Sequence, residues 1–153
     1  MIEPNLMQAV GRFLEPICSQ YRLPTKSGEE KPPRIVYGYL PPLQSNTDND
    51  QAYVIVRPIS GATGEAQSTD VAIIVSCYDR DMTGFDRALD MVARIRTALL
   101  SIPDQVLESR YMLQLPIEWH NVDDQPWPQW QLSITTHWLT GAPRPWSDGT
   151  KYF

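Results

Sequence analysis

The sequence is poor in the residues that build disulfide frameworks and metal centres. It has 2 cysteines, Cys18 and Cys77, and 2 histidines among 153 residues. The cysteines lie far apart and neither belongs to a CxxC pair, so we expect neither a disulfide nor a zinc site. Two free thiols in the core of a protein that folds in a reducing compartment are the expected outcome.

Long apolar runs and excess positive charge are also missing. No apolar run approaches the roughly 20 residues that span a bilayer. The opening MIEPNLMQAV lacks the basic and apolar regions of a secretory signal, so we expect no membrane partner. Lys and Arg number 13 against 18 Asp and Glu, a net charge of −5. A surface of that sign does not attract phosphate backbones, which disfavours a nucleic-acid-binding function.

Catalytic signatures are absent from the sequence. It contains no GxSxG elbow, P-loop, HExxH or GxGxxG, and no cofactor is expected. One cluster has acid–base or metal-binding potential: His120, Asp123 and Asp124, with His137 approaching from a neighbouring strand. The alternative interpretation of this cluster is the end of a strand followed by a solvated hairpin loop.

The length fits a single domain over 1–153, and the 42% hydrophobic residues are an ordinary globular value. Steps of three and four between apolar residues predict two helices, and alternation of apolar and polar residues predicts strands. The helices are expected over 4–15, ending at Pro16, and over 85–100, with Thr83 as N-cap. The strands are expected over 34–40, 53–60, 71–78, 111–119 and 131–139, followed by an irregular tail over about 140–153.

This order, α-β-β-β-α-β-β, predicts an α+β domain: a mainly antiparallel sheet of about five strands with two helices packed on one face. The strand over 71–78 is apolar on both faces and should lie near the centre of the sheet. Pro58 suggests a sheet edge or a bulge. The segment 61–70 is expected to be a long hairpin loop.

Several residues are candidates for contacts with other chains. Asp79, Arg80 and Asp81 form either a solvated turn or a charged patch that pairs with another copy. The five tryptophans all lie in the last 35 residues; Trp119 and Trp138 are expected in the core. Trp127 and Trp130, on a proline-stiffened loop, either anchor a contact or fold back over the sheet edge. The set of candidate contact residues is Arg57, Glu65, Asp79, Arg80, Asp81, Trp127 and Trp130.

Five stretches carry a family resemblance: YVIVRPISGATGE, DVAIIVSCYDRD, GFDRALDMVARIRTALLS, RYMLQLPIEWH and DDQPWPQWQLSITTHWLTGAPRP. Their order, over about residues 53–145, resembles tailed-phage and prophage proteins of the tail-terminator or tail-completion kind. The positions most similar to the family pattern look like packing or turn determinants: Tyr78, Gly84, Trp127, Pro128 and Trp138.

The resemblance implies a non-enzymatic structural protein of the virion, assembled in the bacterial cytoplasm. Its copies would close a ring, usually a hexamer, that caps the tail tube and joins it to the head–tail connector. Its partners would then be other copies of itself, the major tail tube protein and the connector. DNA would pass through without specific binding, and the acidic composition agrees with a passage that repels phosphates.

Two other functions fit the residues. One is a monomeric adaptor that captures a protein or peptide with the Trp127–Trp130 loop. The other is a small metal-dependent hydrolase built on His120, Asp123 and Asp124.

Overall fold

A computed structural model describes residues 2–39, 51–121 and 127–141 of the chain. It confirms the α+β class and the expected order of elements, and adds one short strand. The elements are α1 (Ile2–Cys18), β1 (Arg34–Tyr37), β2 (Tyr53–Thr63), β3 (Ala66–Tyr78), α2 (Thr83–Leu100), the 3-10 turn η1 (Pro103–Gln105), β4 (Val106–Leu107), β5 (Tyr111–Asn121) and β6 (Gln129–Gly141).

The strands form one sheet in the order β1-β2-β3-β6-β5-β4. The β1–β2 pair is parallel, and the other pairs are antiparallel. β3 therefore lies near the centre, as its two apolar faces predict, and is paired with β6 over its whole length.

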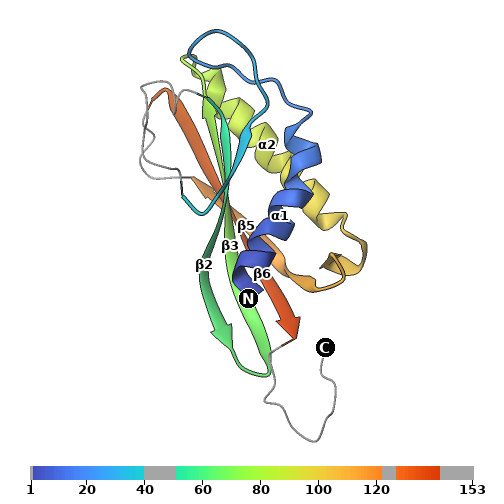
Figure 1. Ribbon diagram of the computed structural model, residues 1–153. Coiled ribbons are helices and arrows are strands. Elements are labelled where there is room, and N and C mark those ends of the chain that lie inside the picture. The colour runs from blue at the N-terminus through green and yellow to red at the C-terminus, as the bar shows by residue number, and fades with distance from the viewer. Residues whose placement is uncertain (1, 40–50, 122–126, 142–153) are drawn as a thin grey trace, which may run out of the picture.

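Both helices pack on the same face of the sheet (Figure 1). The stripe of α2 that faces the sheet is fully buried at Ala88, Met91, Ile95 and Leu99. On the sheet, alternate residues of β2, β3 and β6 complete this core, as the period of two in a strand requires. The largest of them are Val54, Val56, Ile73, Leu132, Ile134 and Trp138.

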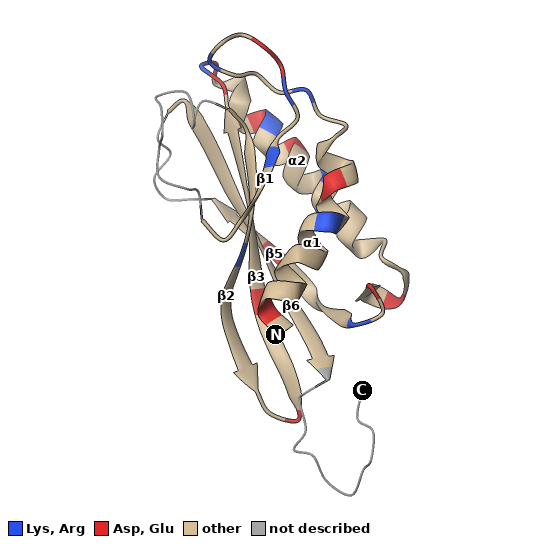
Figure 2. Ribbon diagram, in the orientation of Figure 1, with Lys and Arg blue, Asp and Glu red and all other residues tan. Residues whose placement is uncertain are grey.

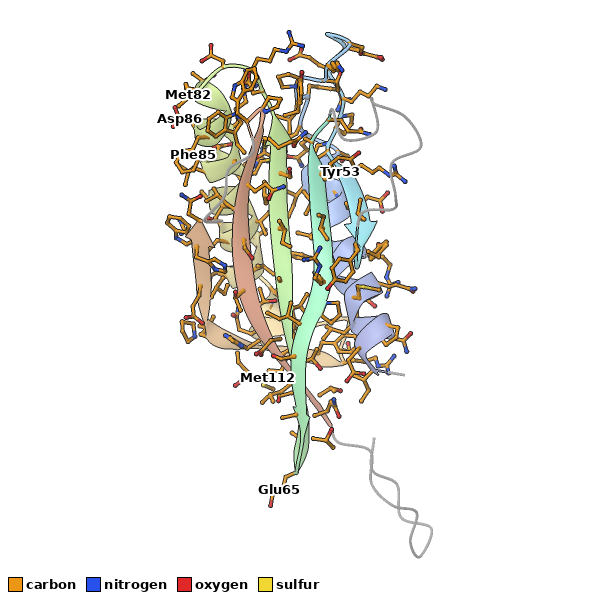
Figure 3. All side chains as sticks on the ribbon, turned by 90° about the vertical axis from the view of Figure 1, so that its left-hand side faces the viewer. Tyr53, Glu65, Met82, Phe85, Asp86 and Met112 are labelled. Atoms are coloured by element: carbon orange, nitrogen blue, oxygen red, sulfur yellow. The ribbon has the colours of Figure 1, made fainter. Side chains whose placement is uncertain are left out.

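The opposite face of the sheet, which we call the open face, is seen from the front in Figure 3. Near β1, Val36, Tyr53 and Ile55 form a small second apolar cluster on this face. Charges are sparse on the four long strands and lie mostly on the helices and turns (Figure 2).

The segment 61–70 is not a loop, which corrects the sequence expectation. β2 and β3 stay paired from Ser60↔Asp70 to Thr63↔Gln67, and β6 pairs with β3 down to Ala66. We call this three-stranded extension (57–63, 66–71 and 136–141) the arm. It reaches past the start of α1, with Glu65 at its tip (Figures 1 and 3).

Side-chain hydrogen bonds explain why a polar sequence forms strands in the arm. Gln67 is buried; its amide nitrogen donates to Glu3 of α1 at 2.9 Å, and its oxygen accepts from Thr63 at 2.8 Å. Periodicity of apolar residues does not detect a strand whose buried positions are polar but paired.

Several expected boundaries are also wrong. α1 passes Pro16 and ends at Cys18, because a proline in the last turn removes only one amide donor. The first strand stops at Tyr37 rather than Leu40. Thr83 is the first residue of α2 rather than its N-cap, and its amide donates to Asp81. The expected tail over 140–153 begins as strand at 140 and 141, and the rest lies outside the described residues.

Candidate functional site

Two groups of candidate contact residues meet at one end of the sheet. Asp79, Arg80 and Asp81 lie in the turn between β3 and α2, and Trp127 and Trp130 lie around the start of β6. The indole N–H of Trp130 donates to the carbonyl of Asp79 at 2.9 Å, and that of Trp127 donates to the carbonyl of Arg80 at 3.0 Å. The Asp79 amide donates to Pro128 at 2.9 Å. Two groups of residues that are separate in the sequence, 79–80 and 127–130, are therefore joined by hydrogen bonds. We call these residues the indole clamp.

The acidic side chains of the turn order the start of α2. Asp79 Oδ1 accepts from the Asp81 amide at 2.9 Å, and Asp81 Oδ1 accepts from the Thr83 amide at 3.2 Å. Asp79 also pairs with Arg87 at 3.1 Å. Most of the charge in this turn is used within the chain, as expected where side-chain oxygens satisfy the free amides at the start of a helix.

The two tryptophans of the clamp differ in exposure. Trp130 is 8% exposed and packs edge-on against Phe85, with ring centres 6.4 Å apart. Trp127 is 59% exposed although its N–H is bonded. Trp130 lies on β6 and belongs to the core under α2, whereas Trp127 presents an exposed indole that is fixed by its hydrogen bond to Arg80. Figure 3 labels Phe85, which contacts Trp130, and the exposed Met82.

Arg57 and Glu65 lie apart from the clamp. Arg57 donates from Nε to the Gly38 carbonyl at 2.9 Å, and its guanidinium stacks on Tyr39, 3.8 Å from the ring centre. It therefore fastens β2 to the end of β1. Glu65 is exposed at the tip of the arm.

The candidate hydrolase cluster is not assembled among the described residues. His120 is exposed on β5, and Asp123 and Asp124 lie outside the described residues. His137 does not approach His120: it is opposite Gln114, whereas His120 is opposite Ser133, four positions along β6. Four positions correspond to about 13 Å.

The structure instead joins four polar side chains across the open face, which we call the cross-sheet chain. Ser60 donates to Asp70 Oδ2 at 2.9 Å. His137 contacts Asp70 Oδ1 through Nδ1 at 2.6 Å and Glu118 Oε1 through Nε2 at 3.1 Å. One residue comes from each of β2, β3, β6 and β5. The sequence analysis missed this chain because only strand order and register place these residues in a row.

The cross-sheet chain favours a protonated imidazole. The pKa of His137 is raised, first by its hydrogen bond to Asp70 and then by that to Glu118. The bond to His137 lowers the pKa of Asp70. Both ring nitrogens are occupied by carboxylates, so His137 has no free nitrogen to activate a nucleophile, and Ser60 bonds to the aspartate instead of the imidazole. The arrangement is suited to holding strands together.

Trp119 corrects the expectation that it is a core residue. It is opposite Ile134 and so faces the helix side of the sheet, yet it is 45% exposed. The other expected core tryptophan, Trp138, is 1% exposed. β5 is irregular between Gln114 and Glu118, which shifts the last four residues of the strand relative to β6.

The described residues include no group of three or more His, Cys, Asp or Glu positioned to hold a metal ion. Cys18 and Cys77 are free and buried, as the sequence predicts. Burial raises the pKa of Cys18 to about 11 and that of Cys77 to about 12. These thiols are therefore protonated and unreactive near neutral pH.

Two surface grooves lie on the helix side. One, of about 380 Å³, lies between the end of α1 and β1 and is lined by Glu15, Cys18, Ser19, Pro32, Pro33, Ile35 and Tyr37. The other, of about 340 Å³, lies between the helices and is lined by Ile17, Ala93, Arg94, Thr97 and Ala98. In the first groove, the hydroxyl of Ser19 donates to the carbonyl of Pro16 at 3.0 Å.

Neither helix in the described part of the chain is long and apolar enough to cross a membrane. No model of a known protein family matches the sequence, and no curated protein matches it.

Proposed function

We propose that this chain is a structural subunit of a tailed-phage or prophage particle, of the tail-terminator kind. In this function its copies form a ring on the tail tube beneath the head–tail connector, a hexamer by analogy with that family. The observation that carries the proposal is that the sheet has two different unpaired strand edges, on opposite sides.

The first edge belongs to β2. β1 pairs with β2 only over Tyr53–Val56, so among the described residues nothing pairs with the outer side of β2 from Arg57 to Thr63. The second edge belongs to β5. β4 pairs with β5 only at Tyr111 and Met112, and within the described ranges no strand pairs with the outer side of 113–120.

Two different edges are what a ring requires. In a ring each subunit presents one patch to the copy ahead and a different patch to the copy behind. β2 and β5 run in opposite directions across the sheet, so β5 of one copy can pair with β2 of the next in the antiparallel manner. Exposed edges are a liability in a monomer, and pairing between copies removes them.

The charge of the sheet supports a passage that DNA crosses without being held. The four long strands contain no lysine and one arginine, Arg57, which is engaged with Gly38 and Tyr39. Such a surface offers few counter-charges to phosphates. We expect no retardation of duplex DNA by the assembled protein in a gel at low salt.

The mass of the full chain in solution tests the proposal. Native mass spectrometry and negative-stain electron microscopy over a range of concentrations should show a single closed oligomer with a central hole. A chain that remains monomeric at every concentration would contradict the ring.

A second function, a monomeric adaptor, is favoured by one observation: Trp127 is exposed and fixed by its bond to Arg80. Rigid aromatic side chains make good anchors for partners. This function requires a monomer, so the same mass measurement separates the two proposals.

A further inference from the structure

Two short windows of free edge remain once the irregular parts of β2 and β5 are set aside. On β2, Pro58 has no amide hydrogen and a bulge follows it, so regular pairing resumes at Ser60. On β5, the irregular segment that contains Pro116 ends at Glu118. The windows are therefore Ser60–Thr63 on the arm and Glu118–His120 on β5.

The side chains of the two windows complement one another in size. The arm window consists of small residues: Ser60, Gly61, Ala62 and Thr63. The β5 window consists of large ones: Glu118, Trp119 and His120. Within it, Trp119 leaves 45% of its surface uncovered. An exposed indole on one edge and a glycine on the other fit a second copy of this chain, because a cross-strand aromatic side chain can cover a glycine.

We propose that β5 of one copy pairs antiparallel with the arm of the next, with Trp119 packed over Gly61; this inference rests on the proposed ring. The register of this pairing follows from the face of the sheet on which each side chain lies. Gly61 is opposite Thr69 and Trp119 is opposite Ile134, so both lie on the helix side of their sheets. Ser60 and His120 then lie opposite one another on the open face, where an imidazole N–H can donate to the serine oxygen while Ser60 donates to Asp70.

This register avoids collisions with the short outer strands. β1 ends beside Val56, whereas His120, at the end of the β5 window, would lie opposite Ser60, so the paired part of the neighbouring strand clears β1. The tip of the arm would lie beside Ile117, before β4 begins to cover β5 at Met112. The arm thus enters a notch between β4 and the free part of β5.

The register also agrees with closure into a ring. Within one copy, Ser60 lies in a row with Asp70, His137 and Gln114. When Ser60 pairs with His120 of the neighbour, each copy is displaced along the strand direction by four residue positions, about 13 Å, relative to the next copy. Each copy contributes four strands to the ring, which span about 19 Å across the strands. The corresponding strand tilt is about 35°, which lies at the edge of the 35–45° range seen when sheets close.

A disulfide tests the register directly. In the Ser60→Cys/His120→Cys variant, directly opposed residues of two copies would be about 5 Å apart between Cα atoms, within disulfide range. Inside one copy the two residues are about 14 Å apart across the sheet and about 13 Å apart along the strands, about 19 Å in all, which is too far for a disulfide. The native cysteines are buried and do not compete.

Mild oxidation of this variant should give a ladder of covalent oligomers on a non-reducing denaturing gel, ending at the ring number. The matched control is Ser60→Cys/Thr97→Cys, because Thr97 is exposed on α2, away from both edges; it should give no ladder. Wild-type rings without a ladder from the first variant would overturn the register and leave the ring proposal standing. A wild-type chain that is monomeric throughout would overturn both.

Substitution of the indole provides a second test. Trp119→Ala should raise the concentration at which half of the chains are assembled by about 30-fold, as for a central aromatic anchor. Trp127→Ala, which removes a more exposed indole elsewhere, should leave that concentration unchanged. Circular dichroism of the monomers should show both variants folded. Loss of assembly with Trp127→Ala but not with Trp119→Ala would contradict the proposed packing.

Discussion

At the scale of single residues, Gly84 and Trp130 show how the start of α2 is joined to β6. A Cβ atom built on Gly84 would lie 2.3 Å from Trp130 Cδ1 and 2.7 Å from Asp79 Cβ. The helix can approach the buried indole only because position 84 has no side chain. The glycine is needed here for close packing.

Gly84→Ala should therefore destabilise the protein by about 1–3 kcal/mol, the usual cost of overpacking a close contact. Urea unfolding followed by circular dichroism measures the loss. The control is Thr83→Ala, next to it and exposed at the first position of α2, which should cost less than about 0.5 kcal/mol. Equal free energies of unfolding for the two variants would contradict this prediction, because they would show that Trp130 and Asp79 can move to accommodate the extra methyl group.

The two tryptophans of the clamp should respond differently to truncation. Trp130→Ala removes a buried indole and should cost about 3–5 kcal/mol. Trp127→Ala removes an exposed one together with a bond to the Arg80 carbonyl, which water can replace, and should cost about 1 kcal/mol or less. Chemical denaturation of both variants measures the difference. A larger loss for Trp127→Ala than for Trp130→Ala would contradict the exposures described above.

His137 should make the stability of the protein dependent on pH. Its folded-state pKa is raised above the reference value of 6.5 by Asp70 and Glu118, so its contribution is full below about pH 6.5 and is lost as the pH rises through the higher folded pKa. The pKa of Asp70 is lowered below 3.8, so its contribution is present above that pH and is lost as the pH falls through the lower value.

The measurement is the difference in free energy of unfolding between wild type and His137→Gln across pH 5–9. The difference should be largest near pH 5–6 and should shrink as the pH rises. Comparison with the variant removes the contributions of groups elsewhere. A difference that grows toward pH 9 would mean that the imidazole is neutral in the folded protein.

At the scale of elements, the arm is supported unevenly. Its central strand, β3, pairs with β2 on one side and with β6 on the other. Among the described residues, the part of β2 that follows Val56 pairs only with β3. Gln67 fastens the arm to Glu3 of α1. The arm is therefore a rigid extension whose outer edge is open, which is the form of an element that contacts another molecule.

Shortening the arm should separate assembly from folding. Gly61 and Thr69 are directly opposed, so residues 62–68 can be replaced by Asn-Gly, a two-residue hairpin turn. The shortened chain should keep its circular dichroism spectrum and cooperative unfolding but form no ring in native mass spectrometry. Assembly at the wild-type concentration would show that the arm is not part of the contact between copies.

The sequence predicted most elements, and the central place of β3, because buried strands and amphipathic helices have clear periods. It missed the arm, because Gln67 and Thr69 occupy buried positions in which periodicity expects apolar residues. It placed Trp119 in the core because alternation gives the face of a strand but not how far the helices cover that face. The sequence also named the residues of the indole clamp without showing that they meet. The indoles donate to the backbone carbonyls of Asp79 and Arg80, and every residue type has such a carbonyl, so the sequence does not indicate which residues accept these hydrogen bonds.

At the scale of the whole molecule, a chain that assembles as proposed gains stability from its neighbours. Binding that favours the folded state stabilises it by mass action, so the midpoint of thermal unfolding should rise with protein concentration. Differential scanning calorimetry at about 0.1 and 10 mg/ml tests this, with Trp119→Ala as the control in which the rise of the midpoint should begin at about 30-fold higher concentration. A midpoint independent of concentration in the wild type would indicate a monomer.

β3 has a further consequence for the kinetics of the native state. Its amides are enclosed by β2 on one side and by β6 on the other, and most of its side chains are buried. Release of these amides to solvent requires several strands to separate together, which costs close to the free energy of global unfolding. In hydrogen–deuterium exchange, residues 71–77 should retain protium longest, and their rate would report the opening of the whole sheet.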